Sequence, residues 1–216
     1  MEQYLDLDQQ IILEGMHKAL SVYLGPLSGT GKLLIYDTNR YANNSYIERV
    51  APYIDYLFYQ SYGASPSRLD QGITGYSEYI SSCQFLSGYT SPEELDGNRW
   101  EDTIGPIWES NAITMAQWQP AGGAKGGIFQ YAIDRDGMTY DEPDYSSIRP
   151  TTFEYAKRVI ATIKSQEFAE TKTSATTTIE ALPTLSQEVK AKITAKVRDA
   201  EVPERHLLSL CHWLLG

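Results

Sequence analysis

The strongest constraint on the fold of this 216-residue chain is a repeated alternation between short apolar segments and segments with helical spacing. The short segments have the length of buried strands and are bounded by Gly, Pro or polar residues. Four of them are predicted as strands, at residues 33–37, 56–61, 83–88 and 126–131. Short strands that alternate with helices form a parallel sheet, so the sequence predicts an α/β fold.

The helices are predicted from apolar residues that recur every three or four positions. The first spans 9–24, with an apolar face of Ile12, Met16, Ala19, Leu20 and Tyr23. Others are expected at 45–53, 73–81, 108–118 and 153–164, the last with an apolar face of Phe153, Ala156, Val159, Ile160 and Ile163. Asp6 and Asp8 precede the first helix, where acids suit the helix dipole, although a pair of catalytic carboxylates is the alternative interpretation.

Polar and aromatic residues stand at the carboxyl ends of the predicted strands. They are Asp37, Gln60, Tyr62 and Tyr131. Barrels of the (β/α)₈ type build their active sites at this face, and a complete barrel needs eight units and about 250 residues. We count about four units, so residues 1–165 are predicted to be the C-terminal half of a (β/α)₈ TIM barrel. We expect a Thr-rich linker at 166–183, followed by a helical tail or the start of a further domain at 184–216.

Charge and composition argue against several classes of partner. The net charge is −10, and the chain has no run of Lys or Arg, so neither nucleic acid nor a membrane is an expected partner. The acidic N-terminus predicts no signal peptide. Three His and two Cys, Cys83 and Cys211, show no metal-ligand spacing, and we expect neither a metal nor another cofactor.

Gln60 and Tyr62 are two residues apart, so on a strand both side chains point to the same side. An amide and a phenol aimed together can bind a polar, uncharged group such as the acetamide of a sugar. Sixteen Tyr and four Trp suit stacking on carbohydrate, but they suit a large core equally well. A Tyr-rich core strand is therefore the alternative interpretation of this segment.

Two runs together, Tyr59-Gln60-Ser61-Tyr62-Gly63 and Gly126–Gly137, resemble family 18 glycoside hydrolases. The resemblance is to secreted bacterial endo-β-N-acetylglucosaminidases, in the branch that trims the N-glycan of antibodies. It covers roughly residues 9–164. Shorter matches occur in the same order, at residues 24–26, 47–49, 51–54 and 118–120.

The resemblance implies a (β/α)₈ barrel that hydrolyses the β-1,4 bond of the di-N-acetylchitobiose core of N-glycans. Its mechanism is retaining and substrate-assisted: the acetamide oxygen of the sugar attacks its own anomeric carbon. By carry-over, Gln60 and Tyr62 hold the acetamide and stabilise the oxazolinium, while Tyr131 lies beneath the sugar. Other residues implied in substrate binding are Asp37, which supports the site, and Glu93, Glu94 and Trp100, which contact glycan arms.

The chain departs from the family at the general acid, a Glu that closes an Asp-x-x-Asp-x-Asp-x-Glu motif. No such motif occurs here, and the nearest register, at residues 3–10, places Gln10 where the acid belongs. A Gln cannot protonate a leaving group. We expect the chain to begin after the catalytic strand of a secreted parent enzyme and to be inactive and poorly stable alone.

A non-catalytic glycan-binding module that keeps Gln60, Tyr62 and Tyr131 is the alternative function. In either case the expected partner is the N-linked glycan of a glycoprotein, with immunoglobulin G as a candidate carrier.

Overall fold

A computed structural model describes residues 6–39, 44–92, 99–140 and 150–166. The chain divides into two compact units, Met1–Thr162 and Ile163–Gly216, and the architecture below belongs to the first, apart from residues 163–166 at the end of the last helix. The predicted linker, apart from residue 166, and the predicted tail at 184–216 lie outside the described residues. Glu93 and Glu94 lie outside them as well.

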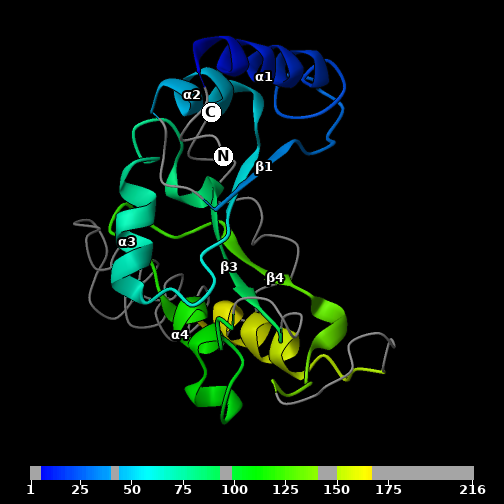
Figure 1. Cartoon of the computed structure of the whole chain (residues 1–216), viewed down its shortest axis with the longest axis vertical. Helices are drawn as coiled ribbons and strands as arrows, with labels where there is room; N and C mark the ends of the chain where they lie inside the picture. Colours follow the sequence, from blue (N-terminus) through cyan, green and yellow to red (C-terminus); the bar gives the residue numbers. More distant parts are fainter. Residues whose placement is uncertain (1–5, 40–43, 93–98, 141–149, 167–216) are drawn as a thin grey trace, which may run out of the picture. The chain divides into compact units, whose positions relative to one another are not determined.

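Four parallel strands form one sheet in the order β1-β2-β3-β4 (Figure 1). The strands are β1 (Ile35–Thr38), β2 (Tyr56–Tyr59), β3 (Phe85–Thr90) and β4 (Gly127–Tyr131). Strands that follow one another in the chain are neighbours in the sheet, as in a (β/α) barrel. The parallel sheet of four β/α units predicted from the sequence is therefore confirmed.

Helices connect the strands, with one helix before β1 and one after β4. They are α1 (Leu7–Leu20), α2 (Asn44–Val50), α3 (Pro66–Thr74), α4 (Asn111–Gln117) and a helix at 154–166. Single 3₁₀ turns occur at η2 (Ala51–Tyr53), η3 (Ser82–Gln84), η4 (Ile107–Glu109) and η5 (Ile133–Arg135). No described helix combines the length and the apolar character that a bilayer crossing requires.

Local capping explains where the predicted boundaries were right and where they were wrong. Asp6 accepts a hydrogen bond from the Gln9 backbone N–H at 2.8 Å, so the helix-start interpretation of Asp6 is confirmed. The predicted helix at 73–81 is wrong, because α3 begins at Pro66, which is favoured in a first helical turn, and ends at Thr74. β3 begins two residues later than predicted, since Ser81 and Gln84 form a capping box around η3.

One face of the sheet packs on the helices and forms the core. Leu57, Tyr59 and Phe85 point to this side, and Leu57 and Phe85 are completely buried. Tyr59 packs against Phe85 with ring centroids 5.6 Å apart. The core continues into buried residues of the helices and their loops, which include Ile47, Val50, Ile54, Leu69, Tyr76, Met115 and Val159.

The predicted apolar face of α1 is not covered by any described residue. Ile12 is 64% exposed, Met16 54% and Tyr23 69%, and the buried residue of the helix is Gln10. α1 lies beside α2 (Figure 1), joined to it by an ion pair of 2.7 Å between Glu14 and Arg49. The spacing therefore predicted the helix, although it ends at Leu20 and not at residue 24, and its apolar residues are exposed in the described chain.

In the last described helix, the buried residues differ in part from the predicted apolar face. Its buried residues are Tyr155 and Val159, four positions apart, whereas Phe153 and Ile160 are 41% and 52% exposed. Phe153 precedes the helix and has a positive φ of 56°, which turns it away from the predicted face.

Candidate active site

The second face of the sheet carries the residues that the sequence singled out. In a parallel sheet, paired residues of neighbouring strands point to the same face. Asp37 pairs with Phe58, and Thr90 pairs with Tyr131. Gln60 follows Phe58 by two residues and therefore continues the same face at the carboxyl end of β2.

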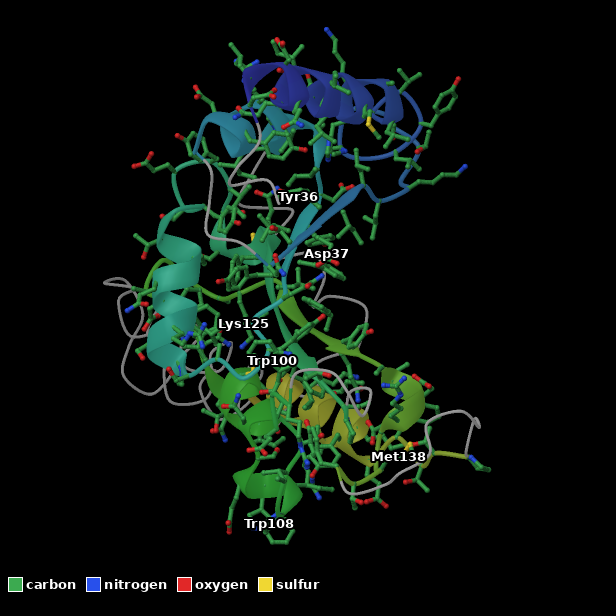
Figure 2. The ribbon with its side chains drawn as sticks, viewed as in Figure 1. Tyr36, Asp37, Trp100, Trp108, Lys125 and Met138 are labelled. Atoms are coloured by element: carbon green, nitrogen blue, oxygen red, sulfur yellow. The ribbon has the colours of Figure 1, made fainter. Side chains whose placement is uncertain are left out.

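Asp37 and Gln60 form a direct contact at this face (Figure 2 labels Asp37). The Gln60 Nε2 donates to Asp37 Oδ2 at 2.8 Å. A carboxylate only accepts hydrogen bonds, so the amide nitrogen of Gln60 faces Asp37 and its oxygen points elsewhere. The Gln60 backbone N–H also donates to Thr38 O at 2.8 Å, which continues the β1–β2 ladder beyond β2.

Four aromatic rings form a continuous row on the same face. Phe58 stacks on Phe129 with centroids 4.7 Å apart, and Tyr62 stacks on Tyr131 at 5.7 Å. Tyr62 also meets the edge of Phe129 at 6.4 Å. Tyr131 is 47% exposed at the end of this row, so its ring is available to a ligand.

A glycine in β3 makes this row possible. The Phe129 ring lies directly over Gly88, where the Cβ of any other residue would overlap the end of the ring. Phe129 therefore reaches across β3 to Phe58 because position 88 has no side chain.

The hydroxyl of Tyr62 is held in its protonated form. Burial, reinforced by the charges of Asp37, Tyr131 and Asp102, raises the pKa of Tyr62 well above its ordinary value. A phenol is protonated at neutral pH even at its ordinary pKa, so Tyr62 is a hydrogen-bond donor there, and the raised pKa extends this protonation to higher pH.

Trp100 is the member of the predicted loop that the structure places beside the site (Figure 2). It is 38% exposed. Gly63 follows Tyr62 with a φ of 66°, and a Cβ there would lie 3.0 Å from Trp100 Cε3. The indole therefore packs against the backbone of the turn that carries Tyr62, and Gly63 provides both the backbone conformation and the space.

Two buried acids in the same region were missed by sequence reasoning. Asp102 accepts hydrogen bonds from backbone groups at the ends of β2 and β3. Asp136 accepts from the backbone N–H groups of Tyr155 and Ala156 at 3.1 and 2.9 Å, and so caps the helix at 154–166. Asp102 had no recognisable signal, because it lies in a polar loop with partners distant in sequence. Asp136 stands inside the Gly126–Gly137 run, but no local pattern indicated that it caps a helix about twenty residues later.

The general acid expected from the family has no counterpart at the N-terminal register. Gln10 is 7% exposed and lies within α1, in the helix and not at the end of a strand. Among the described residues, no group of three or more His, Cys, Asp or Glu could hold a metal ion. The structure thus brings together Asp37, Gln60, Tyr62, Trp100 and Tyr131 and does not place Gln10 with them.

Comparisons with known proteins identify the family. The family of the endo-β-N-acetylglucosaminidase EndoS TIM-barrel domain matches residues 1–130. Endo-β-N-acetylglucosaminidase F2 of Elizabethkingia meningoseptica is 43% identical over 146 residues, which cover 66% of this chain and 43% of that protein. Endo-β-N-acetylglucosaminidase EndoS of Streptococcus pyogenes serotype M1 is 32% identical over 176 residues, covering 65% of this chain and 18% of that protein.

A solved structure is similar over most of this chain. The apo endo-β-N-acetylglucosaminidase of Cordyceps militaris is 41% identical with a TM-score of 0.68, covering 74% of this chain and 53% of that one. A mutant of the same enzyme, solved in complex with fucosyl-N-acetylglucosamine-Asn, gives the same values. This chain spans less than half the length of the F2 enzyme, and its sheet is part of an α/β barrel. The chain therefore belongs to the endo-β-N-acetylglucosaminidase EndoS TIM-barrel domain family.

Proposed function

We propose that this chain supplies the acetamide-binding part of an endo-β-N-acetylglucosaminidase active site. The main support is that Gln60 and Tyr62 share one face of the sheet, at the ends of β2 and β4. Gln60 is fixed by Asp37, and Tyr62 is stacked on Tyr131. An amide oxygen can accept from the acetamide N–H, and a protonated phenol can donate to the acetamide oxygen. The pair is therefore complementary to a 2-acetamido sugar.

The proposed chemistry uses the substrate's own acetamide. Tyr62 donates to the acetamide oxygen and aims it at the anomeric carbon, where it forms the new C–O bond as the leaving sugar departs. Gln60 accepts from the acetamide N–H, whose acidity rises as positive charge develops on the oxazolinium. Tyr131 supplies an exposed ring beneath the sugar, and Trp100 provides a second aromatic surface beside Gly63.

Protonation of the leaving sugar needs a carboxylic acid, and the chain lacks the Asp-x-x-Asp-x-Asp-x-Glu sequence that carries it in the family. We therefore expect the 216 residues alone to bind the glycan core without cleaving it. The acid would have to come from a complementary barrel segment.

The proposed ligand is the core of an N-linked glycan. The fungal relative was solved with fucosyl-N-acetylglucosamine-Asn, a sugar joined to asparagine. We extend the proposal to glycoproteins as partners, with immunoglobulin G as the first to test, and to a secreted parent enzyme.

Calorimetric titration of the full chain with di-N-acetylchitobiose tests the proposal, and the non-acetylated disaccharide is the matched ligand. We expect only the acetylated sugar to bind. Tyr62→Phe removes one hydrogen bond and should weaken binding by about 3- to 10-fold. Tyr131→Ala should weaken it further, because it removes the stacking surface.

Tyr23→Phe is the control, since Tyr23 is 69% exposed in the loop after α1. It should bind as the wild type does. Equal binding of the two disaccharides, or full affinity in Tyr62→Phe, would contradict the proposal.

A glycan-binding module is the second candidate function, because the Asp37–Gln60 and Tyr62–Tyr131 pairs form entirely within this chain. Incubation with an N-glycosylated protein, with and without a complementary segment that carries the acidic motif, separates the two. Glycan release that depends on the added segment supports the enzyme part. Binding without release under both conditions supports the module.

A further inference from the structure

A buried carboxylate connects the turn that carries Tyr62 with the end of β3, the strand that pairs with β4 beside Tyr131. Asp102 is completely buried. It accepts from the Gly63 backbone N–H at 3.0 Å (Oδ1) and 3.1 Å (Oδ2), and from the Thr90 backbone N–H at 3.1 Å (Oδ2). The Asn111 Nδ2 donates to Oδ1 at 2.6 Å. We call these four residues the Asp102 network.

The two backbone donors to Asp102 stand beside the stacked tyrosines in the sequence or in the sheet. Gly63 is the residue after Tyr62, and Thr90 is the β3 residue paired with Tyr131 in the sheet. The Asp102 carboxylate therefore holds the backbone next to Tyr62 and also the β3 backbone that pairs with Tyr131. Tyr62 lies beyond the end of β2, so the ladder between the strands does not fix its position.

Other contacts hold the earlier part of this turn. Ser61 Oγ donates to Gly88 O at 3.1 Å and accepts from the Gly88 N–H at 3.0 Å. These bonds fix residue 61 against β3, and the contact with Thr38 fixes residue 60 against β1. The Asp102 carboxylate fixes the backbone on the far side of Tyr62, through the Gly63 N–H.

We propose that Asp102 is a positioning residue for the acetamide site: its carboxylate holds Gly63 and Thr90 so that the Tyr62 ring stays stacked on Tyr131. This inference rests on the proposed function for its consequence on sugar binding, but not for its effect on the two rings. Asn111 has a supporting role, because it also donates to Ala64 O at 3.1 Å and so ties Asp102 to the next turn.

The hydrogen-bond pattern explains why the residue is Asp and not Asn. Both carboxylate oxygens face N–H donors, and only a group that accepts on both sides satisfies them. In Asp102→Asn, either orientation of the amide places its NH₂ group against another N–H. In the exchange Asp102→Asn with Asn111→Asp, the amide oxygen at the Oδ2 position can still accept from Gly63 and Thr90, and its NH₂ donates to the new carboxylate. The contact of Gly63 with the Oδ1 position is lost.

The first experiment measures the two rings directly, by NMR of the full chain with labelled tyrosine for the rings and labelled backbone nitrogen for the amides. Wild type should show cross-ring contacts between Tyr62 and Tyr131, assigned with Tyr131→Ala. Asp102→Asn should lose these contacts and shift the Gly63 and Thr90 amide signals. The exchange variant should recover them in part, since the contact with Ala64 O becomes repulsive.

The second experiment measures affinity for di-N-acetylchitobiose. Because hydrogen bonds to a charged group are lost, Asp102→Asn should bind about ten-fold more weakly, and the exchange variant should regain part of that loss. Asp55→Asn is the matched control: Asp55 Oδ2 accepts from the Leu34 N–H at 2.8 Å at the opposite end of the sheet. It should lower stability but leave affinity and ring contacts unchanged.

Each outcome decides the proposal. Retained ring contacts in Asp102→Asn, or an equal loss in Asp55→Asn, would overturn it and leave a purely structural role. If the wild type binds no sugar, the proposed function fails, whereas the ring contacts still test Asp102. If Asp102→Asn does not fold, Asn111→Ala removes a single donor to the carboxylate and should weaken the ring contacts partially; unchanged contacts there would count against the proposal.

Discussion

At the scale of single residues, Tyr62 combines a fixed ring with a hydroxyl that resists ionisation. Its ring lies against Tyr131 and Phe129, and burial raises the pKa of its hydroxyl. Burial also raises the pKa of Tyr89, with Asp136 and Asp102 adding to the shift. The burial that raises both pKa values therefore makes the fold sensitive to alkali.

We predict that the free energy of unfolding falls as the pH rises above about 10. The folded-state pKa values of Tyr62 and Tyr89 are raised above the ordinary value of 10.0. Below about pH 10 the two tyrosines are protonated in the folded and the unfolded state, so their contribution to the free energy of unfolding is fully present. Above it the unfolded chain loses these protons first, and the contribution falls. Urea denaturation between pH 8 and pH 11 measures the slope, which Tyr89→Phe should reduce and Tyr23→Phe should not. An unchanged slope in Tyr89→Phe would contradict the prediction.

Gly88 provides a second prediction at this scale. Gly88→Ala should lower the free energy of unfolding by about 1–3 kcal/mol, because the new methyl group displaces Phe129 from its stack on Phe58. Chemical denaturation measures the loss. Gly15→Ala is the control, since Gly15 lies within α1 with open space around it, and it should stabilise by about 0.5–1 kcal/mol. An unchanged free energy of unfolding in Gly88→Ala would show that the Phe129 ring is not confined.

At the scale of elements, hydrogen bonds to side chains set several helix ends. Lys125, a buried cation, donates through Nζ to Ala116 O at 2.8 Å and to Trp118 O at the C-terminal end of α4. Cations suit this end of a helix, where carbonyl groups lack partners within the helix. Asp136, an anion, accepts hydrogen bonds from free backbone N–H groups at the N-terminal end of the helix at 154–166.

We predict that Asp136→Ala lowers the free energy of unfolding by about 1–2 kcal/mol, the usual cost of a lost N-cap. The buried Asp136 carboxylate also accepts from Gln130 Nε2 at 3.1 Å, so the loss should reach β4 as well. Hydrogen exchange should accelerate at residues 154–159. Asp134→Ala, at an exposed neighbouring position, should leave both measurements unchanged. Unchanged exchange in Asp136→Ala would refute the capping role.

At the scale of the whole molecule, the described part of the chain has uncovered apolar surface. β1 and β4 are the outer strands of the described sheet, and the apolar face of α1 lies open. Contiguous apolar surface and unpaired strand edges promote association.

We therefore predict that the isolated chain self-associates at micromolar concentration and that Ile12→Lys with Met16→Lys reduces this association. Both side chains are more than half exposed, so each substitution should change the free energy of unfolding by less than about 0.5 kcal/mol. Light scattering and chemical denaturation measure the two effects. Leu69→Lys, at a completely buried position, should unfold the chain. A double variant as aggregated as the wild type would show that another surface is responsible.

The sequence by itself determined the α/β class, the four parallel strands and the residues at their carboxyl ends. Apolar runs and the Gly and Pro residues around them are local signals, and the order of elements dictates a parallel sheet. Only the tertiary structure decided which side chains meet. Asp102 bonds to residues 39, 12 and 9 positions away, and no local pattern encodes such contacts. Spacing likewise reveals that α1 has an apolar face, but whether that face is covered depends on what packs against it, which is a property of the assembled fold.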